Sequence, residues 1–148
     1  MSSHDLANRE PFRITARAVQ IMLGCLWLLD GVLQLQPKMF GQSFVTVVLS
    51  PASSGQPALL ATPLVHMDHL VAISPAAFNA VFAAAQLLIG AGLLSRATVK
   101  PALVLSFGWA LAVWIVGEGF GSLFTGQASP ITGAPGAVLL YAVIGLLV

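Results

Sequence analysis

The sequence has little charge and a single cysteine. Charged residues make up 7 % of the 148 positions, whereas hydrophobic residues make up 57 %. Because a soluble globular chain carries about 25 % charged residues, an ordinary soluble enzyme is excluded. Disorder is excluded too, since it requires low hydrophobicity and high charge.

The missing cysteines and the small net charge exclude further classes. Cys25 alone cannot form an intramolecular disulfide framework, a CxxC redox pair or a cysteine-rich zinc site. A formal net charge of +1 does not indicate the basic surface with which proteins bind nucleic acid. The mean hydropathy of +0.92 instead indicates a small polytopic membrane protein.

Long apolar runs are abundant. A helix that crosses a bilayer needs about 20 predominantly apolar residues. The candidate runs are at about 14–35, 76–95, 101–120 and 134–148. The last run covers only about 22 Å at 1.5 Å per residue, so we expect a short or tilted helix unless the chain continues past Val148. The sequence therefore predicts an all-α fold, a single membrane domain over 1–148 with four transmembrane helices.

The beginnings of the first two runs support this interpretation. Ser74-Pro75 is a favourable helix start, because serine can cap a helix and proline loses no needed N–H bond in the first turn. The first run lacks a small-residue cleavage site and is longer than a typical signal core, so we expect it to be a retained helix.

Basic residues lie mainly on one side of the predicted helices. Arg9, Arg13 and Arg17 precede or begin the first helix, and Arg96 and Lys100 lie between the second and third. Only Lys38 lies on the other side. Basic residues near helix ends mark the cytoplasmic side, so both termini are expected to be cytoplasmic.

The outer loop, 36–74, is predicted to lie partly in the membrane interface. Residues 51–57 have the composition of a turn, whereas 44–49 and 58–73 are apolar. We expect a short interfacial helix over 64–73. Its apolar side would consist of Leu64, Met67, Leu70 and Val71.

Polar side chains recur at helical spacing inside the predicted spans. Such side chains are costly in a bilayer and usually face protein or a water-filled cavity. In the first span one stripe consists of Gln20, Leu23, Trp27, Asp30 and Gln34. This stripe is expected to face the bundle.

The second and third spans add polar residues toward the same outer side. Asn79 and Gln86 share a helix face with Phe82, and Trp114 and Glu118 share a face of the third span. The candidate ligand or proton site residues are Asp30, Gln34, Asn79, Gln86, Trp114 and Glu118.

Each candidate also has a structural interpretation. Asp30 can pair with Lys38 or cap a helix, and Glu118 can reach water at the interface. Asn79 and Gln86 can form interhelical hydrogen bonds worth about 1 kcal/mol. The tryptophans Trp27, Trp109 and Trp114 can serve in packing or interface anchoring.

A metal site is a further hypothesis. His66 and His69 share a helix face, and Met67 and Asp68 lie between them. Imidazole with thioether suits copper, and imidazole with carboxylate suits zinc. Completing the site requires Asp30, Asp68 or Glu118.

The glycine-rich segment 117–121 is not a phosphate-binding loop, because it follows a membrane helix and lacks the Lys-Ser/Thr of a P-loop. Its glycines would instead let the backbone approach another helix or a cofactor closely.

Several short motifs resemble a group of bacterial four-helix membrane proteins. The motifs are Leu29-Asp30-Gly31, Leu33-Gln34-Leu35-Gln36-Pro37, Phe78-Asn79-Ala80, Gln86-Leu87-Leu88-Ile89-Gly90, Gly117-Glu118-Gly119-Phe120-Gly121 and Thr132-Gly133-Ala134-Pro135-Gly136. More distantly, the layout of nearly the whole chain is similar to the DoxX-like family. Some DoxX-like proteins are membrane partners of quinone-linked sulfur or thiol oxidation. The resemblance implies a role beside a redox complex in the bacterial inner (cytoplasmic) membrane, but thiol chemistry of the chain's own is not expected without an outward cysteine pair.

Three functional hypotheses follow. The first is a non-catalytic accessory or structural subunit of a respiratory or otherwise redox-linked complex, in contact with lipid and with other membrane subunits or copies of itself. The second is an outward-facing metal- or proton-binding or transport module using Asp30, Glu118 and His66/His69. The third is a membrane enzyme that handles a quinone or lipid beside Trp27, Trp114 and Glu118. We expect no catalysis by the chain alone.

Overall fold

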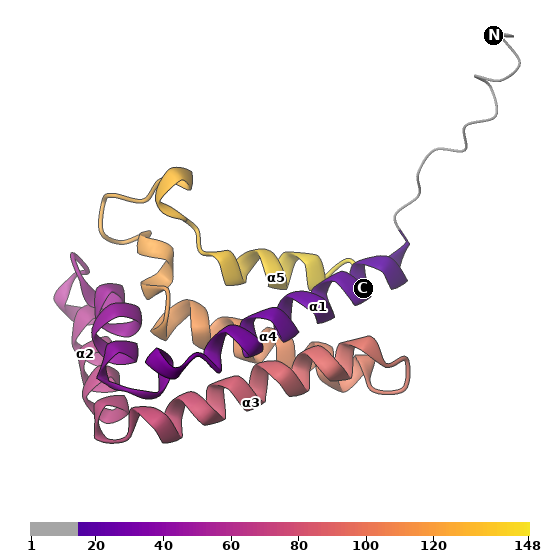
Figure 1. Ribbon diagram of the computed structural model, residues 1–148. Coiled ribbons are helices and arrows are strands. Elements are labelled where there is room, and N and C mark those ends of the chain that lie inside the picture. Colours follow the sequence, from indigo (N-terminus) through magenta and orange to yellow (C-terminus); the bar gives the residue numbers. More distant parts are fainter. Residues whose placement is uncertain (1–14) are drawn as a thin grey trace, which may run out of the picture.

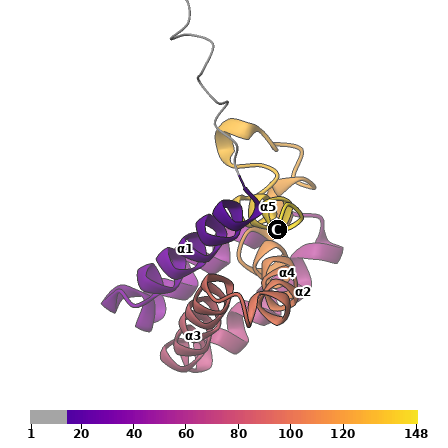
Figure 2. The ribbon, with the colours of Figure 1, turned by 90° about the vertical axis from the view of Figure 1, so that its right-hand side faces the viewer.

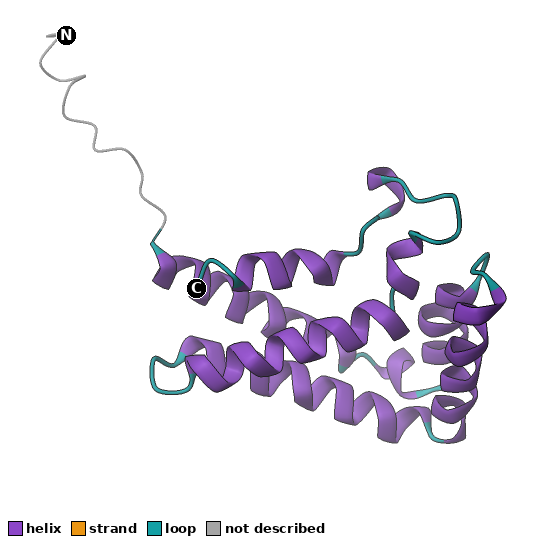
Figure 3. Cartoon of the chain, turned by 180° about the vertical axis from the view of Figure 1, so that it is seen from behind, coloured by secondary structure: helices purple, strands orange, loops and turns teal. Residues whose placement is uncertain are grey.

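The computed structural model describes residues 15–148, and within this range all regular secondary structure is helical (Figure 3). The helices are α1 (Ala16–Gln34), α2 (Ala58–Ile73), α3 (Pro75–Leu94), α4 (Val99–Val116) and α5 (Ala137–Gly145). Short helical turns are η1 (Pro37–Phe40), η2 (Phe44–Leu49), η3 (Ser50–Ser53), η4 (Gly119–Ser122) and η5 (Pro130–Thr132). The expected all-α class is confirmed.

Four of the helices form a bundle. Helix α1 packs against α3, α3 against α4, α4 against α5, and α5 returns to α1 (Figure 2). Helix α2 lies across one end of this bundle with η2 and η3 beside it (Figure 1). We call this the capped end. The beginning of α1, the turn between α3 and α4, and the C-terminus lie at the opposite end (Figure 1).

Three helices are long and apolar enough to cross a membrane. They are α1, α3 and α4, with mean hydropathies of 1.5, 1.8 and 1.8. Their outer surfaces expose large apolar side chains, including Leu29, Val32, Val81, Leu88, Val104 and Leu105. Such a surface suits contact with lipid, because exposed apolar patches of this extent are rare in soluble monomers.

The fourth predicted span contains only a short helix. Helix α5 has nine residues, which corresponds to about 14 Å at 1.5 Å per residue. That is well below the hydrocarbon thickness of about 30 Å.

The observed helix ends differ from the expected ones in informative places. Helix α1 begins after Thr15, whose side chain accepts a hydrogen bond from the Ala18 N–H, whereas Ser74 makes no such bond before α3. Helix α4 ends at Val116, and the chain leaves helical geometry at Glu118 (φ −105°, ψ 1°) and then at Gly119, where φ is 51°. The span predicted over 101–120 is therefore helical only to Val116, although the side chains of Trp114 and Glu118 still lie side by side, because a Cβ on Gly136 would meet both. Arg9, Arg13 and Ile14 lie outside the described residues.

The helix expected over 64–73 is present but longer. Helix α2 begins at Ala58 and includes Pro63. Its buried side chains are Leu64, Asp68 and Val71, so an acid lies within the face that was expected to be apolar. Leu70, also expected on that face, is 47 % exposed.

Helices α1 and α3 share the largest interface of the bundle. At their crossing a Cβ atom on Gly90 would lie 2.8 Å from the carbonyl oxygen of Gly24, and one on Gly31 would lie 2.7 Å from Leu87. Small residues at such a crossing allow two backbones to pack directly against each other.

Side chains link the same two helices at both ends. Arg17 Nη2 donates to the Leu94 carbonyl over 2.7 Å, and Gln20 Nε2 donates to the Leu93 carbonyl. At the capped end, Asn79 Nδ2 donates to the Gln34 carbonyl over 2.8 Å. The last carbonyls of a helix have no intrahelical partner, and in lipid no water can supply one. These bonds also show that the two helices are antiparallel.

The predicted inward stripe of α1 is confirmed, since Gln20, Leu23 and Trp27 are buried. Trp27 Nε1 donates to Ser106 Oγ over 2.8 Å, which links α1 to α4 through the core. The Trp27 ring also packs edge-to-face on Tyr141 of α5, with ring centroids 5.0 Å apart. One side chain thus connects three helices.

The helix crossing predicts a difference between two glycines. Gly90→Ala should lower the melting temperature, since overpacking a tight contact costs about 1–3 kcal/mol. Gly108→Ala is the matched control, because a Cβ on Gly108 of α4 meets nothing within 4 Å. Alanine favours a helix by about 1 kcal/mol over glycine, so this control should be unchanged or more stable. Thermal unfolding in detergent measures both, and equal effects would contradict the packing account.

Candidate functional site

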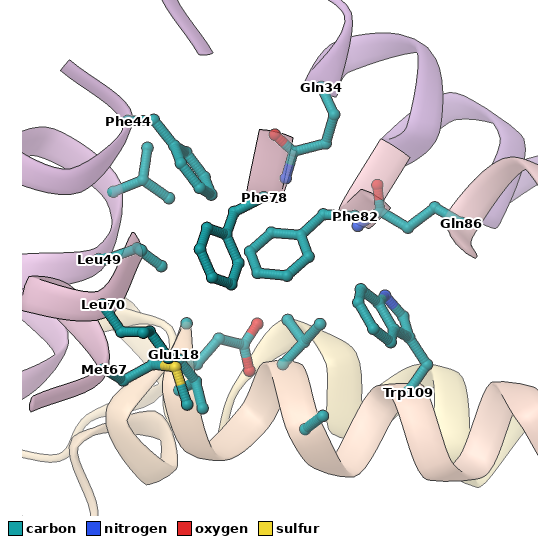
Figure 4. A pocket seen from close by; sticks show the side chains of 15 residues that line it. Gln34, Phe44, Leu49, Met67, Leu70, Phe78, Phe82, Gln86, Trp109 and Glu118 are labelled. Carbon is teal, nitrogen blue, oxygen red and sulfur yellow. The ribbon is translucent and has the colours of Figure 1, made fainter. Parts of the chain in front are cut away.

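The capped end of the bundle contains a cavity of about 440 Å³, which we call the main cavity (Figure 4). Its walls are largely aromatic and apolar and include Phe44, Phe78, Phe82, Trp109, Met67 and Leu70. The ring of Phe82 contacts those of Phe44 and Trp109 edge-to-face, with centroids 5.9 Å and 5.5 Å away. The polar residues of the lining are Gln34, Gln86 and Glu118.

Several polar atoms of this lining are buried without a hydrogen-bond partner. They are Gln34 Oε1, Gln86 Oε1, Trp109 Nε1 and Glu118 Oε2. Figure 4 shows the side chains of Gln34, Gln86 and Trp109 reaching toward Phe78 and Phe82 from different elements. An unpaired buried polar group costs about 1–3 kcal/mol, so their concentration here indicates a site that water or a ligand completes.

Two smaller cavities adjoin the main cavity. One, of about 260 Å³, is lined by Asp30 and Tyr141 and shares Gln34, Gln86 and Glu118 with the main cavity. We call it the acid chamber. The other, of about 270 Å³, is lined by Glu118 with residues of the segment 121–137. We call it the loop cavity. Glu118 therefore lines all three.

Backbone geometry places Glu118 at this junction. Its Oε1 accepts a hydrogen bond from the Val138 N–H over 3.1 Å at the beginning of α5, where an anion is favoured by the helix dipole. Gly119 and Gly121 have positive φ, and a Cβ on either would collide with the backbone of Ala52 or Pro135. The glycines do allow close backbone approach, but their neighbours are η3 and the segment before α5 rather than a long helix or a cofactor.

The protonation of Glu118 is also affected by its position. Burial raises the pKa of Glu118, and the charge of Asp30 adds to the rise. Hydrogen bonds from the backbone of Val138 and Ala137 oppose it by stabilising the carboxylate. Burial is the larger of these effects, so the pKa of Glu118 lies above its ordinary value.

The structure brings together some predicted residues and separates others. Asp30, Gln34, Gln86 and Glu118 all line the acid chamber. Asn79 is bonded to the Gln34 carbonyl, and Trp114 Nε1 donates to the Pro135 carbonyl over 2.7 Å; neither lines the three cavities.

Two site residues were missed from the sequence. Trp109 was assigned to packing, but it supplies an unpaired N–H to the main cavity. Tyr141 lies beside the Asp30 carboxylate, whereas Lys38, the partner considered for Asp30, is exposed. The available signal was that Tyr141 is the one tyrosine of the sequence, within an otherwise apolar run.

Within the described part of the chain, no third ligand joins His66 and His69 to form the hypothesised metal site. His66 and His69 are exposed on α2, and Asp68 is buried. Across residues 15–148, no group of three or more His, Cys, Asp or Glu side chains is placed to hold a metal ion. Asp30 and Glu118 lie instead around the acid chamber.

Comparison with known proteins finds no matching family model, no matching curated protein and no matching solved structure. Function is therefore inferred from the chemistry of the cavities. They combine aromatic walls with N–H donors, amide oxygens and two carboxyl groups. Small-molecule sites commonly have this composition, mostly apolar with a few converging polar groups.

Asp68 generates a prediction about stability and pH. Burial raises the pKa of Asp68, while a hydrogen bond from Ser50 and the charge of His69 oppose the rise. The folded state then binds this proton more tightly than the unfolded state, so the associated stability is lost as the pH rises through the folded pKa. Asp68→Asn cannot ionise and should melt above the wild type at neutral pH, with the difference shrinking toward about pH 4. Thermal unfolding across this range tests it; a constant difference would contradict the assignment.

Proposed function

We propose that the chain is an integral protein of a bacterial cytoplasmic membrane, crossing it four times with both termini in the cytoplasm. The short helix α5 and the residues around it form the fourth, short or tilted span. The distribution of basic residues supports this orientation. Arg17 is bonded to the end of α3, near Arg96 in the following turn and Lys100 at the beginning of α4, whereas Lys38 follows α1 at the capped end. The capped end then faces outward.

Within this membrane, the main cavity binds an amphiphilic ring compound of the quinone class. The observation that carries this proposal is the set of unpaired polar atoms among aromatic walls. A quinone is a flat ring with carbonyl oxygens that accept hydrogen bonds. The unpaired Trp109 N–H can donate to such an oxygen, and the Nε2 groups of Gln34 and Gln86 can donate as well. Their unpaired Oε1 atoms accept hydrogen bonds and therefore match water or the O–H groups of the reduced, quinol form. The phenylalanine rings can pack on the ring.

The size of the main cavity supports the same ligand class. Small-molecule pockets commonly measure about 300–1,000 Å³, and this cavity measures about 440 Å³. Its lining comes from α1, η2, α2, α3, α4 and the turn after α4. The site therefore depends on the whole capped end.

We assign this binding protein as a non-catalytic accessory subunit of a respiratory or otherwise redox-linked membrane complex, as the DoxX-like resemblance implies. Exposed apolar side chains of α1, α3 and α4 offer a surface to lipid or to a partner helix. Gly108 on α4 leaves open space where another helix could pack closely. The partner would carry out the electron transfer.

Binding of a short-chain ubiquinone to the purified protein in detergent tests the ligand proposal. Tryptophan fluorescence is the readout, because Trp109 lines the main cavity. Gln86→Leu should weaken binding about tenfold, since a buried hydrogen bond contributes about 1 kcal/mol or more. The control Gln36→Leu makes the same chemical change at an exposed position and should bind like the wild type. No binding by the wild type, or equal loss in both variants, would sink the proposal.

The accessory role is tested by native mass spectrometry of the protein extracted in mild detergent from its own membrane. We expect a heavy assembly containing other membrane subunits. Deletion of the protein should then reduce assembly or activity of that partner enzyme. A chain released without other subunits, and a partner profile unchanged by the deletion, would contradict the accessory role and leave the ligand proposal to its own test.

A further inference from the structure

Glu118 lies where the three cavities at the capped end meet. It lines the loop cavity, the acid chamber and the main cavity. Its Oε1 is held by the Val138 N–H, while its Oε2 is buried and has no hydrogen-bond partner. One oxygen thus anchors the carboxyl group and the other is available for exchange.

Among residues 15–148, the groups that face Glu118 include no cation. Asp30 approaches from α1 and Tyr141 from α5, and the acid chamber is otherwise lined by neutral side chains. The described lining of the loop cavity contains neither lysine, arginine nor histidine. Two carboxylates that share a chamber without a counterion repel each other, which favours retention of a proton.

Gln86 is an independent observation that points into the same place. Its side chain is only 6 % exposed, and its Oε1 has no partner. It lines both the main cavity and the acid chamber. A buried amide at the boundary of two cavities can hydrogen-bond to a water on one side and to a ligand on the other.

We propose that Glu118 exchanges protons between water in the loop cavity and the ligand site in the main cavity, by way of the acid chamber. On the water side the exchange is a single acid–base step: an O–H bond of a hydronium ion breaks as an O–H bond forms at Glu118 Oε2, and the reverse step returns the proton to water. On the ligand side the Oε2–H bond breaks as an O–H bond forms at a ring oxygen, together with reduction of the ring by electrons from the redox partner subunit. The ligand as destination rests on the proposed function, whereas exchange at Glu118 does not.

The test is site-resolved labelling of the full chain in lipid nanodiscs with a water-soluble carbodiimide, which reacts with protonated carboxyl groups. Mass spectrometry reports modification of Glu118 separately from the other acids. Labelling of Glu118 should persist to a higher pH than a free glutamate side chain allows, and should fall as the pH rises further. Asp30→Asn removes a neighbouring negative charge and should lower the midpoint of this fall. Each pH unit by which the midpoint is lowered corresponds to about tenfold less protonated Glu118 above the midpoint.

A matched pair of variants tests the route. Ala137 lines both the loop cavity and the acid chamber, whereas Leu140 is exposed on the same helix and lines neither. Ala137→Trp should slow labelling of Glu118 and Leu140→Trp should not. Glu118 unlabelled at every pH, a midpoint indifferent to Asp30→Asn, or equal effects of the two tryptophans would each overturn the proposal.

Ubiquinone binding separates this proposal from the proposed function. Glu118→Gln keeps an oxygen for the Val138 N–H but cannot take up or release a proton in this pH range, so its affinity for the short-chain ubiquinone, whatever its magnitude, should not change with pH. Wild-type affinity should fall as the pH rises, because the protonated carboxyl donates a hydrogen bond to the ligand, and Glu118→Gln should remove this dependence. Absence of ubiquinone binding by the wild type would overturn the proposed function. Binding whose pH dependence is the same in the wild type and in Glu118→Gln would overturn proton exchange with the ligand.

Discussion

The antiparallel contact between α1 and α3 is the constraint on which the rest of the structure depends. Gly24 and Gly90 bring the two backbones together, and side chains of each helix bond the last carbonyls of the other. The crossing also sets the relative height of Gln34 and Gln86, which both line the main cavity. Trp27 then connects this pair to α4 and α5 through Ser106 and Tyr141.

The capped end is formed largely by η2 and α2, which lie outside the three long apolar helices. Phe44, Val45, Leu49 and Val71 form a second apolar cluster away from the bundle core. Beyond α4, the turn through Gly119 and Gly121 directs the chain toward α5. This turn places the Glu118 side chain between the end of α4 and the beginning of α5. A carboxyl group is thereby held beside an aromatic cavity whose lining contains polar atoms without hydrogen-bond partners. Ligand binding and proton exchange are proposed for the same end of the molecule for this reason.

Much of the fold was predictable, because membrane helices require long apolar runs and their polar residues must face protein. The stripe through Gln20 and Trp27 is buried as its spacing predicts. The site was predictable only in part. Asp30, Gln34, Gln86 and Glu118 were recognised as costly polar residues, but the cavities that they share were not. Tyr141 and Trp109 were missed, because aromatic residues in apolar runs look like packing until their polar atoms are seen to face a cavity.

The sequence by itself determined the helical class, the three long apolar helices and the inward side of α1, since these depend on composition and on a period within one segment. Only the tertiary structure decided where α4 ends, that Asp68 is buried in a helix expected to be apolar on that side, and that Asp30 and Glu118 line one chamber. These features depend on backbone conformations of glycine-rich turns and on contacts between segments far apart in the chain. No periodicity within a single segment encodes a meeting between α1, the turn after α4 and α5.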